Sequence, residues 1–422
     1  MKTRGDAYAV RAARVVALSL GGLLAGFPLQ AQRILVPQTE IVDLTPSVDT
    51  ASSNWVGSAG APLLMRPAGV QNYPLELGPV HFHPHLGYSI IYGEGILRGP
   101  GDPSSTVLHT LAPGVYMNLG QHWDLDITAT INRYSNASVH DNNGFYLGLR
   151  GLVPLENWIW TFGYQAGLSE EPQIETGTFT LQNTHLATAS GTYSFNARYS
   201  LEVNASQDFR VTEQLTDYYT WSTLEWLNYH LTTRTTAGLG LGGGYSMAAP
   251  GVDWTFEQFQ GRIVWLPGDK LSFQVSGGGQ VQQFLTNGAS THVSPIVAGA
   301  VVYHVFEPTT LSFTGRRLIE NAYQSGLFDE ATTASVALRQ RLFRQLYLTL
   351  QPGYDLRRYR EVVGDHGQTR RDEYLTFYGA LSTQLFKKLS LLAFYQYGDN
   401  NSTQPGFTFH ETQVGFRVDY RY

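Results

Sequence analysis

The chain has 422 residues, of which 42% are hydrophobic, 15% charged and 13% aromatic, with 44 Gly, 25 Tyr and no Cys. Charged residues fall below the roughly 25% of an average soluble protein, and a net charge of −6 argues against nucleic acid, which requires a basic face. The absence of Cys excludes disulfides, thiolate metal centres and a Cys nucleophile. The composition favours a β protein rich in Tyr and Gly.

The first 31 residues have the three parts of an export signal. A basic start precedes the apolar run Val15–Leu29, and the small residue Ala31 stands before a predicted cleavage at Gln32. The alternative is a membrane anchor, but the run is shorter than the about 20 residues that a bilayer requires. We therefore predict that residues 1–31 are a cleaved signal peptide.

Residues 32–80 separate the signal from the first predicted strand. The stretch from Gln32 to Pro79 holds six prolines and little alternation. Because Pro removes donors from a strand ladder, we expect an irregular periplasmic N-terminal extension. A flexible leader is the simplest interpretation, and a plug in the barrel or a segment that binds a periplasmic partner are the alternatives.

Several later segments alternate apolar and polar residues, as strands do when one face meets lipid and the other a polar lumen. The clearest are Phe195–Ser206, Asn157–Leu168, Trp123–Arg133 and Leu271–Phe284. A soluble β-sandwich would alternate in the same way, so alternation alone predicts strands and does not predict a membrane.

The spacing of short turns is more discriminating. Between consecutive turns lie two strands and a longer polar stretch, and short turns at one rim with long loops at the other are typical of outer-membrane barrels. A propeller or solenoid would need four strands per repeat or a recurring residue signature. Eight predicted turns, spaced 34 to 43 residues apart, are anchored at Gly120, Pro154, Gly191, Asn228, Pro267, Glu307, Arg344 and Lys387.

Counting strands completes the fold prediction. Eight turns join sixteen strands, one strand near His81–Tyr92 precedes them and one near Phe409–Tyr422 follows them. The sum of eighteen is even, as single-chain bacterial barrels require, and each strand needs about 9–11 residues to cross the bilayer. We predict an all-β, transmembrane antiparallel β-barrel of about 18 strands (16–18) over residues 81–422, with a wet interior.

The final strand carries the most specific pattern. It ends on an aromatic residue, and one of its faces is entirely apolar or aromatic, with Val414, Phe416, Val418, Tyr420 and Tyr422. Here the sequence resembles Gram-negative outer-membrane β-barrels, whose last strand serves as a signal to the barrel-insertion machinery. The organisation resembles more loosely the β-barrel porins associated with exopolysaccharide systems. The resemblance implies an outer-membrane location, with membrane lipid, lipopolysaccharide and the insertion machinery as partners.

Three histidines form a weak candidate metal site. His81, His83 and His85 share one face of a strand, and neutral imidazoles suit Zn, Cu or Ni. Pro84 disturbs this strand and no carboxylate stands near in sequence, so a polar rim is the preferred interpretation. We expect no metal, no cofactor and no catalytic residues.

Arginines gather in the C-terminal third, and alternation directs several charged side chains into the lumen. Rings of Arg in a pore favour anions, whereas arginines paired with lumen acids such as Glu320 and Asp355 would only stabilise the wall. The predicted pore-lining residues are Arg198, Glu202, Arg316, Arg339, Arg341 and Arg357.

The functional prediction is a pore for small hydrophilic solutes, anionic or saccharide, because a barrel of 16–18 strands encloses an aqueous channel. Two alternatives remain. One is a non-conducting outer-membrane protein for polysaccharide export, adhesion or assembly. The other is a lipid or lipopolysaccharide hydrolase, which predicts a Ser/His or Asp/His cluster on the outer rim. The sequence does not identify an oligomeric state.

Overall fold

The computed structural model describes residues 75–94, 105–136, 139–172, 175–176, 179–363, 367–386 and 388–422. The predicted signal peptide, residues 1–31, and the predicted extension up to residue 74 lie outside this set. Within it, no helix is long and apolar enough to cross a bilayer.

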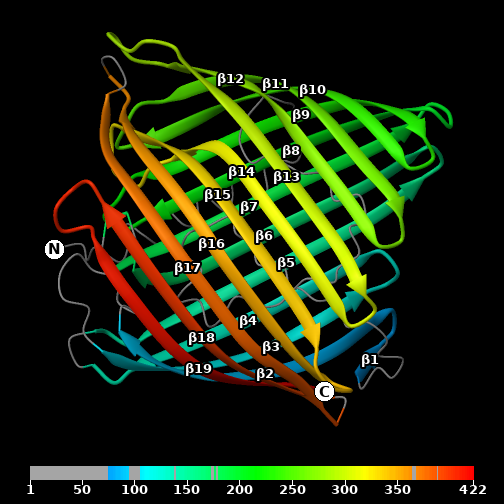
Figure 1. The fold of residues 1–422 in the computed structure, drawn as a ribbon, viewed down its shortest axis with the longest axis vertical. Helices are drawn as coiled ribbons and strands as arrows, with labels where there is room; N and C mark the ends of the chain where they lie inside the picture. The colour runs from blue at the N-terminus through cyan, green and yellow to red at the C-terminus, as the bar shows by residue number, and fades with distance from the viewer. Residues whose placement is uncertain are drawn as a thin grey trace.

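The described residues form one antiparallel sheet whose strands run obliquely around a barrel (Figure 1). The short strand β1, Leu75–Leu77, pairs with the start of β2, and the other eighteen strands form the wall. These are β2 Val80–Glu94, β3 Thr106–Leu119, β4 Trp123–Tyr134, β5 Asn142–Leu155, β6 Trp158–Pro172, β7 Phe179–Ser194, β8 Tyr199–Thr212, β9 Asp217–Thr232, β10 Thr235–Ala249, β11 Trp254–Gly268, β12 Leu271–Phe284, β13 His292–Phe306, β14 Thr309–Asn321, β15 Leu327–Arg341, β16 Leu346–Glu361, β17 Gln368–Leu385, β18 Leu389–Ser402 and β19 Phe409–Arg421.

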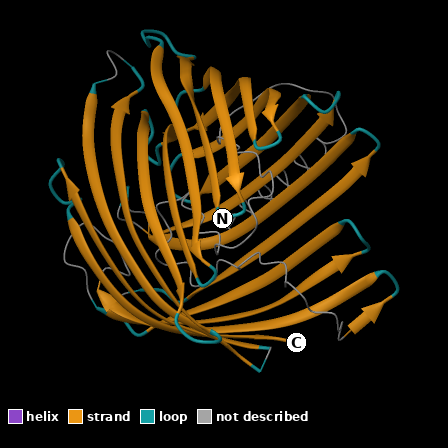
Figure 2. Cartoon of the chain, turned by 45° about the vertical axis from the view of Figure 1, so that its right-hand side comes forward, coloured by secondary structure: helices purple, strands orange, loops and turns teal. Residues whose placement is uncertain are grey.

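The ring is closed by pairing between its first and last wall strands. Each strand from β2 to β18 pairs with the next one, and β19 pairs with β2 through Val414 opposite Tyr92 and Arg421 opposite His85. Figure 2 shows the strands curving around a common interior. The predicted all-β antiparallel barrel of 18 strands is therefore confirmed.

Alternation along each strand separates the two surfaces of the wall. On β11, Phe259 is 54% exposed and Ile263 48%, whereas Gln260 is 1% exposed and Arg262 5%. Directly paired residues share a face, so the exposed apolar side continues from Phe259 to its partner Leu241 on β10. The outer surface is thus apolar and the polar side chains point inward.

The two rims differ in their connections. Turns of two to four residues join β3 to β4 and the later pairs at that rim, whereas loops of four to eleven residues join the strands at the other rim. Four turn anchors lie inside strands: Pro154 and Pro267 stand one residue before the ends of β5 and β11, and Gly191 and Asn228 stand three and four residues before the ends of β7 and β9. The anchor Lys387 lies outside the described residues. The position of a Cβ on Gly191 is 2.8 Å from the Trp160 ring, so this glycine accommodates a ring and makes no turn.

The strands are longer than the predicted 9–11 residues. They run from 12 residues in β4 to 18 in β17. At about 3.3 Å per residue and a tilt near 45°, a strand of 15 residues rises about 35 Å, which exceeds the about 25 Å apolar band of a barrel. Strand ends therefore extend beyond the apolar band.

The outer face generates a prediction for Leu241, which lies near the middle of β10 and is 63% exposed. Leu241→Arg should lower the free energy of unfolding in lipid vesicles by about 2–4 kcal/mol, because it places a charge at mid-bilayer depth. Thr188→Arg, on the inner face of β7, is the control and should lower the free energy of unfolding by less than half as much. Guanidinium titration of both variants measures this, and equal losses would contradict the assignment of the faces.

Candidate functional site

The end of β14 leaves the barrel wall. Pairing between β13 and β14 stops at Val297 opposite Arg317, although β13 continues to His292 and β14 to Asn321. Pro295 lies in the part of β13 that pairs with β12 but no longer with β14, and a proline has no N–H to donate to a ladder. Gly315 of β14 lies just before the point of departure, where a residue without a side chain lets the strand bend.

We call Leu318–Ala331, the joined ends of β14 and β15, the inner hairpin. A strand in the wall buries alternate residues, but four consecutive residues of β15, Phe328 to Ala331, are buried here. On β14 the neighbours Leu318 and Ile319 are both buried. Both faces of the inner hairpin are therefore covered, because it lies inside the barrel.

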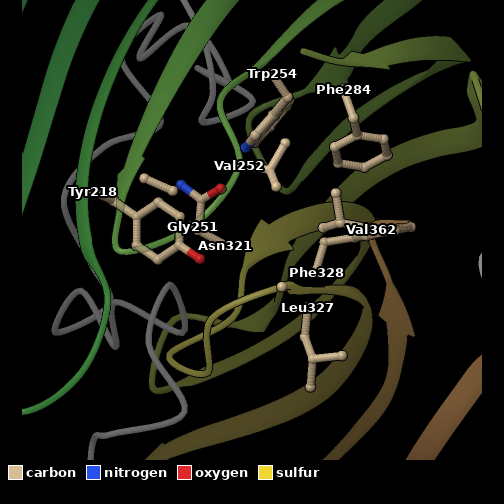
Figure 3. A pocket seen from close by; sticks show the side chains of 11 residues that line it. Tyr218, Gly251, Val252, Trp254, Phe284, Asn321, Leu327, Phe328 and Val362 are labelled. Atoms are coloured by element: carbon tan, nitrogen blue, oxygen red, sulfur yellow. The ribbon is translucent and has the colours of Figure 1, made fainter. Parts of the chain in front are cut away.

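An apolar cluster holds one face of the inner hairpin against the inner wall. Phe328 packs on Phe284 of β12 with ring centroids 5.2 Å apart, and Trp254 of β11 and Val362 complete the contact. Figure 3 shows Trp254 and Phe284 on one side of a small pocket and Phe328 and Val362 on the other. The expected wet interior is thus wrong at this rim, where two layers of sheet enclose a dry core.

The tip of the inner hairpin reaches strands that lie far from it around the ring. The Asn321 amide donates to Thr220 Oγ1 of β9 at 3.2 Å, and the Tyr323 hydroxyl donates to Gln182 of β7 at 3.1 Å. Arg210 of β8 lies over the Tyr323 ring at 3.9 Å and donates to the Asn321 carbonyl. The inner hairpin therefore crosses part of the lumen and narrows it.

A second loop fastens the tip. Glu175, between β6 and β7, accepts the Gln324 backbone N–H at 3.0 Å, and its own carbonyl accepts from Arg370 at 2.7 Å. Burial raises the pKa of Glu175, while backbone N–H groups of Tyr323 and Gln324 act in the opposite direction. The connection between β6 and β7 is thereby tied to both β14–β15 and β17.

A buried ion cluster holds the other face of the inner hairpin. The Arg357 guanidinium of β16 lies 2.7 Å from Asp329, 3.1 Å from Glu320 and 3.3 Å from Asp355. Arg316 lies 3.4 Å from Glu320. Since buried charges are costly unless paired, this geometry couples the position of the inner hairpin to β16.

Further ion pairs at this constriction join its arginines to carboxylates. Glu330 contacts Arg317 at 3.0 Å, Arg360 at 3.1 Å and His292 at 3.0 Å. The arginines at the constriction are Arg210, Arg316, Arg317, Arg357, Arg360 and Arg370, and the carboxylates are Glu175, Glu320, Asp329, Glu330, Asp355 and Asp372. Six positive groups thus face six acids.

The predicted pore-lining residues separate into groups. Arg316 and Arg357 belong to the constriction. Glu202 lies on the inner wall 2.7 Å from Arg262 of β11, whose guanidinium stacks at 4.2 Å over the buried Trp226 ring. Arg316, Arg357 and Glu202 are therefore paired with oppositely charged side chains and do not form a ring of free charge.

The remaining predicted residues lie near the rim with the short turns. Arg339 stacks over Tyr347 at 4.7 Å, and Arg341 approaches the exposed Glu307 at 3.8 Å. Arg198 does not lie in a strand, because β8 begins only at Tyr199. Its backbone N–H donates to the Asn196 side chain at 2.8 Å, a local bond that makes a turn where the sequence predicted a strand.

The three histidines of β2 point into the barrel toward different partners. His81 lies 3.5 Å from Glu76 and His85 lies 3.4 Å from Asp126, while the His83 ring lies 6.0 Å from that of Tyr116. In the part of the chain that the structure describes, no three His, Asp or Glu side chains group as metal ligands would.

The predicted insertion signal lies on the outer surface of β19. Val414 is 52% exposed and Phe416 41%, and Val418, Tyr420 and Tyr422 follow on the same face. Recognition by the insertion machinery stays a prediction.

Sequence reasoning missed Arg262, Asp329, Glu330 and Glu175. Arg262 continues the polar face of β11 after Gln258 and Gln260, a signal that alternation already contained. The adjacent acids Asp329 and Glu330 break the alternation of β15, which is the mark of a strand buried on both faces. No local signal marks Glu175, since its partners are more than one hundred residues away.

No protein-family model and no curated protein sequence matches the chain. Among solved structures, OpdK of Pseudomonas aeruginosa with vanillate aligns at 9% identity and a TM-score of 0.45, covering 82% of this chain and 99% of that one. OccK2 of the same organism, in complex with glucuronate, aligns at 9% identity and a TM-score of 0.44, covering 81% of this chain and 98% of that one. A bacterial polysaccharide outer membrane secretin aligns at 11% identity and a TM-score of 0.35, covering 80% of this chain and 98% of that one.

Such distant similarities carry no argument about a solute, and the fold rests on the strand pairing of this chain. Eighteen antiparallel strands in a closed ring, apolar outside and polar inside, define a transmembrane β-barrel of the outer-membrane type. The constriction built on its inner hairpin is the candidate functional site.

Arg357 provides the test of this site. Arg357→Ala should destabilise the packed inner hairpin by about 3–5 kcal/mol, because it leaves three carboxylates without their shared partner. Amide hydrogen exchange of Leu318–Ala331 in the folded barrel measures this loss of local stability. Arg341→Ala is the matched control: its partner Glu307 is exposed, so the expected change stays below about 1 kcal/mol. Unchanged exchange in Arg357→Ala would contradict the role of the cluster.

Proposed function

We propose that this protein is an outer-membrane channel for small hydrophilic solutes. The observation that carries the proposal is the division of the closed wall into an exposed apolar surface and an inner surface lined with polar side chains. Rings of about eight strands fill their interior with their own side chains, whereas rings of 16–18 strands enclose a channel.

The constriction favours an uncharged solute. Two of the arginines predicted to favour anions, Arg316 and Arg357, lie at the constriction. Both are paired with carboxylates. Away from the constriction, the inner wall carries side-chain amides such as Gln258, Gln260 and Gln396, which donate to and accept from hydroxyl groups. Of the two predicted classes, saccharide-like solutes fit these observations better than anions.

The location follows from the same surfaces. An apolar outer face requires lipid around it. The predicted export signal and the aromatic final strand support a location in the outer membrane of a Gram-negative bacterium. We propose that residues 1–31 are cleaved, and that lipid, lipopolysaccharide and the barrel-insertion machinery are the partners.

The second candidate function is a non-conducting barrel for polysaccharide export, adhesion or assembly. The dry core between the inner hairpin and β11–β12 favours it, because this core fills part of the lumen. A hydrolase is less favoured. An Asp/His pair, Asp399 with His410, does lie at the surface on β18 and β19, but within the described residues neither side chain hydrogen-bonds to a Ser or Thr hydroxyl. We propose that the protein is not an enzyme.

Planar-bilayer recording tests the channel. Purified full-length protein should give stepwise single-channel openings, because the ring is wide enough to retain a water-filled path beside the inner hairpin. A heat-denatured sample of the same preparation is the control. Silence of the folded protein across repeated insertions would favour the non-conducting barrel.

Charge balance at the constriction gives a second prediction. The reversal potential of the unmodified channel in a KCl gradient should lie near zero, and Asp355→Asn should shift it toward anion selectivity by leaving Arg357 in excess. Asp269→Asn, in the exposed turn between β11 and β12, should leave it unchanged. A strongly anion-selective unmodified channel would contradict the pairing of these arginines.

A further inference from the structure

The outer face of the wall carries arginines at the rim with the long loops. On β17, Leu375 is 53% exposed, and Arg371 stands four residues before it, so that both lie on the outer face. Arg358 of β16 lies directly opposite Arg371 and shares this face. Arg360, two residues beyond Arg358 on the same strand, does so too. On β16 and β17 the apolar outer surface is thus followed by a basic one.

A fourth arginine, Arg317, comes from β14. It pairs with Val297 of β13, which is 45% exposed, so Arg317 also belongs to the outer face. On the same face of β14–β17 the described residues hold two carboxylates, Glu330 and Glu373. Four positive groups therefore meet two negative ones. The members of what we call the outer arginine cluster are Arg317, Arg358, Arg360 and Arg371.

The two carboxylates are held by three of these arginines. Glu330 lies 3.0 Å from Arg317 and 3.1 Å from Arg360, and Glu373 forms an ion pair with Arg371. Within the described residues, no ion pair or hydrogen bond joins the Arg358 side chain to another side chain. Like charges directly opposite each other on neighbouring strands are destabilising. An anion bound between Arg358 and Arg371 would remove this repulsion.

The outer arginine cluster lies at the depth of lipid headgroups. The four residues from Leu375 to Arg371 span about 13 Å along the strand, or about 9 Å along the membrane normal at a tilt near 45°. Since the long loops of outer-membrane barrels face the exterior, the cluster lies at the outer leaflet. The side chains of Arg371, Arg360 and Arg317 are 41%, 26% and 24% exposed, so a headgroup can reach them.

We propose that the outer arginine cluster binds the phosphate groups of lipopolysaccharide. A guanidinium group matches a phosphate through two parallel hydrogen bonds, which makes Arg the preferred residue for such sites. Arg317 and Arg371 stand three strands apart, about 14 Å at the usual strand spacing, so the cluster suits an amphiphile with more than one phosphate. Phosphatidylglycerol carries a single phosphate, whereas lipopolysaccharide carries several. The proposal rests on the outer-membrane location proposed above and not on conduction.

Binding of a truncated lipopolysaccharide, which consists of lipid A and the inner core, tests the cluster. It is titrated onto the full-length barrel purified in detergent, and native mass spectrometry gives the apparent dissociation constant. Arg358→Gln/Arg371→Gln should bind at least about tenfold more weakly, a loss of about 1.4 kcal/mol. The matched control, Arg234→Gln/Arg344→Gln, removes two exposed arginines from turns at the other rim and should bind as the unmodified protein does. An unchanged affinity of Arg358→Gln/Arg371→Gln would overturn the proposal.

Two further ligands test the chemistry on the unmodified barrel, and this test does not depend on the folding of a variant. The same lipopolysaccharide without its phosphate groups should bind at least about tenfold more weakly, and so should phosphatidylglycerol. Equal binding of the dephosphorylated form would show that the cluster does not recognise phosphate. Equal binding of phosphatidylglycerol would overturn the assignment to lipopolysaccharide.

The channel and the lipopolysaccharide site fail separately. A silent barrel whose binding is lost in Arg358→Gln/Arg371→Gln contradicts the channel and supports the site. A conducting barrel whose binding is the same with and without the two arginines supports the channel and overturns the site.

Discussion

The bilayer offers no hydrogen-bond partner to a peptide group, and this constraint governs the wall. A closed ring satisfies it, because β19 returns to β2 and leaves no strand edge in the membrane. Pairing between β13 and β14 stops at Val297, before either strand ends. There the end of β14 turns inward, and the candidate site lies at that place.

Besides the backbone pairing of Leu327–Ala331 with Arg357–Glu361 of β16, the inner hairpin has two kinds of side-chain attachment. Its apolar side packs on Trp254 and Phe284, as any two stacked sheets do, and this contact has little directional preference. Its polar side is fixed by Arg357, whose geometry with Asp329 and Glu320 allows little displacement. The first side-chain attachment supplies burial, and the second adds directional contacts to a register that the ladder with β16 already fixes, so a narrow passage retains a defined shape.

Much of the wall could be predicted from the sequence, because period-two alternation reports directly on two surfaces. The strand Leu271–Phe284 has the predicted bounds, and the outward face of β19 was anticipated residue by residue. Arg198 was misplaced because the Asn196 side chain makes a turn that alternation does not reveal. The inner hairpin could not be predicted, since its burial depends on partners brought together only by the closed ring.

The wall contains one seam of a different kind from the others. Seventeen of its eighteen seams join strands that are consecutive in sequence, whereas the seam of β2 with β19 joins residues more than 300 positions apart, such as Tyr92 and Val414. Consecutive strands meet quickly, but a contact of such long sequence separation forms late. Until it forms, the sheet has two open edges that attract other chains. Assembly therefore requires protection of both edges during a slow final step, and the rate of that step sets the time during which the protein is prone to aggregate.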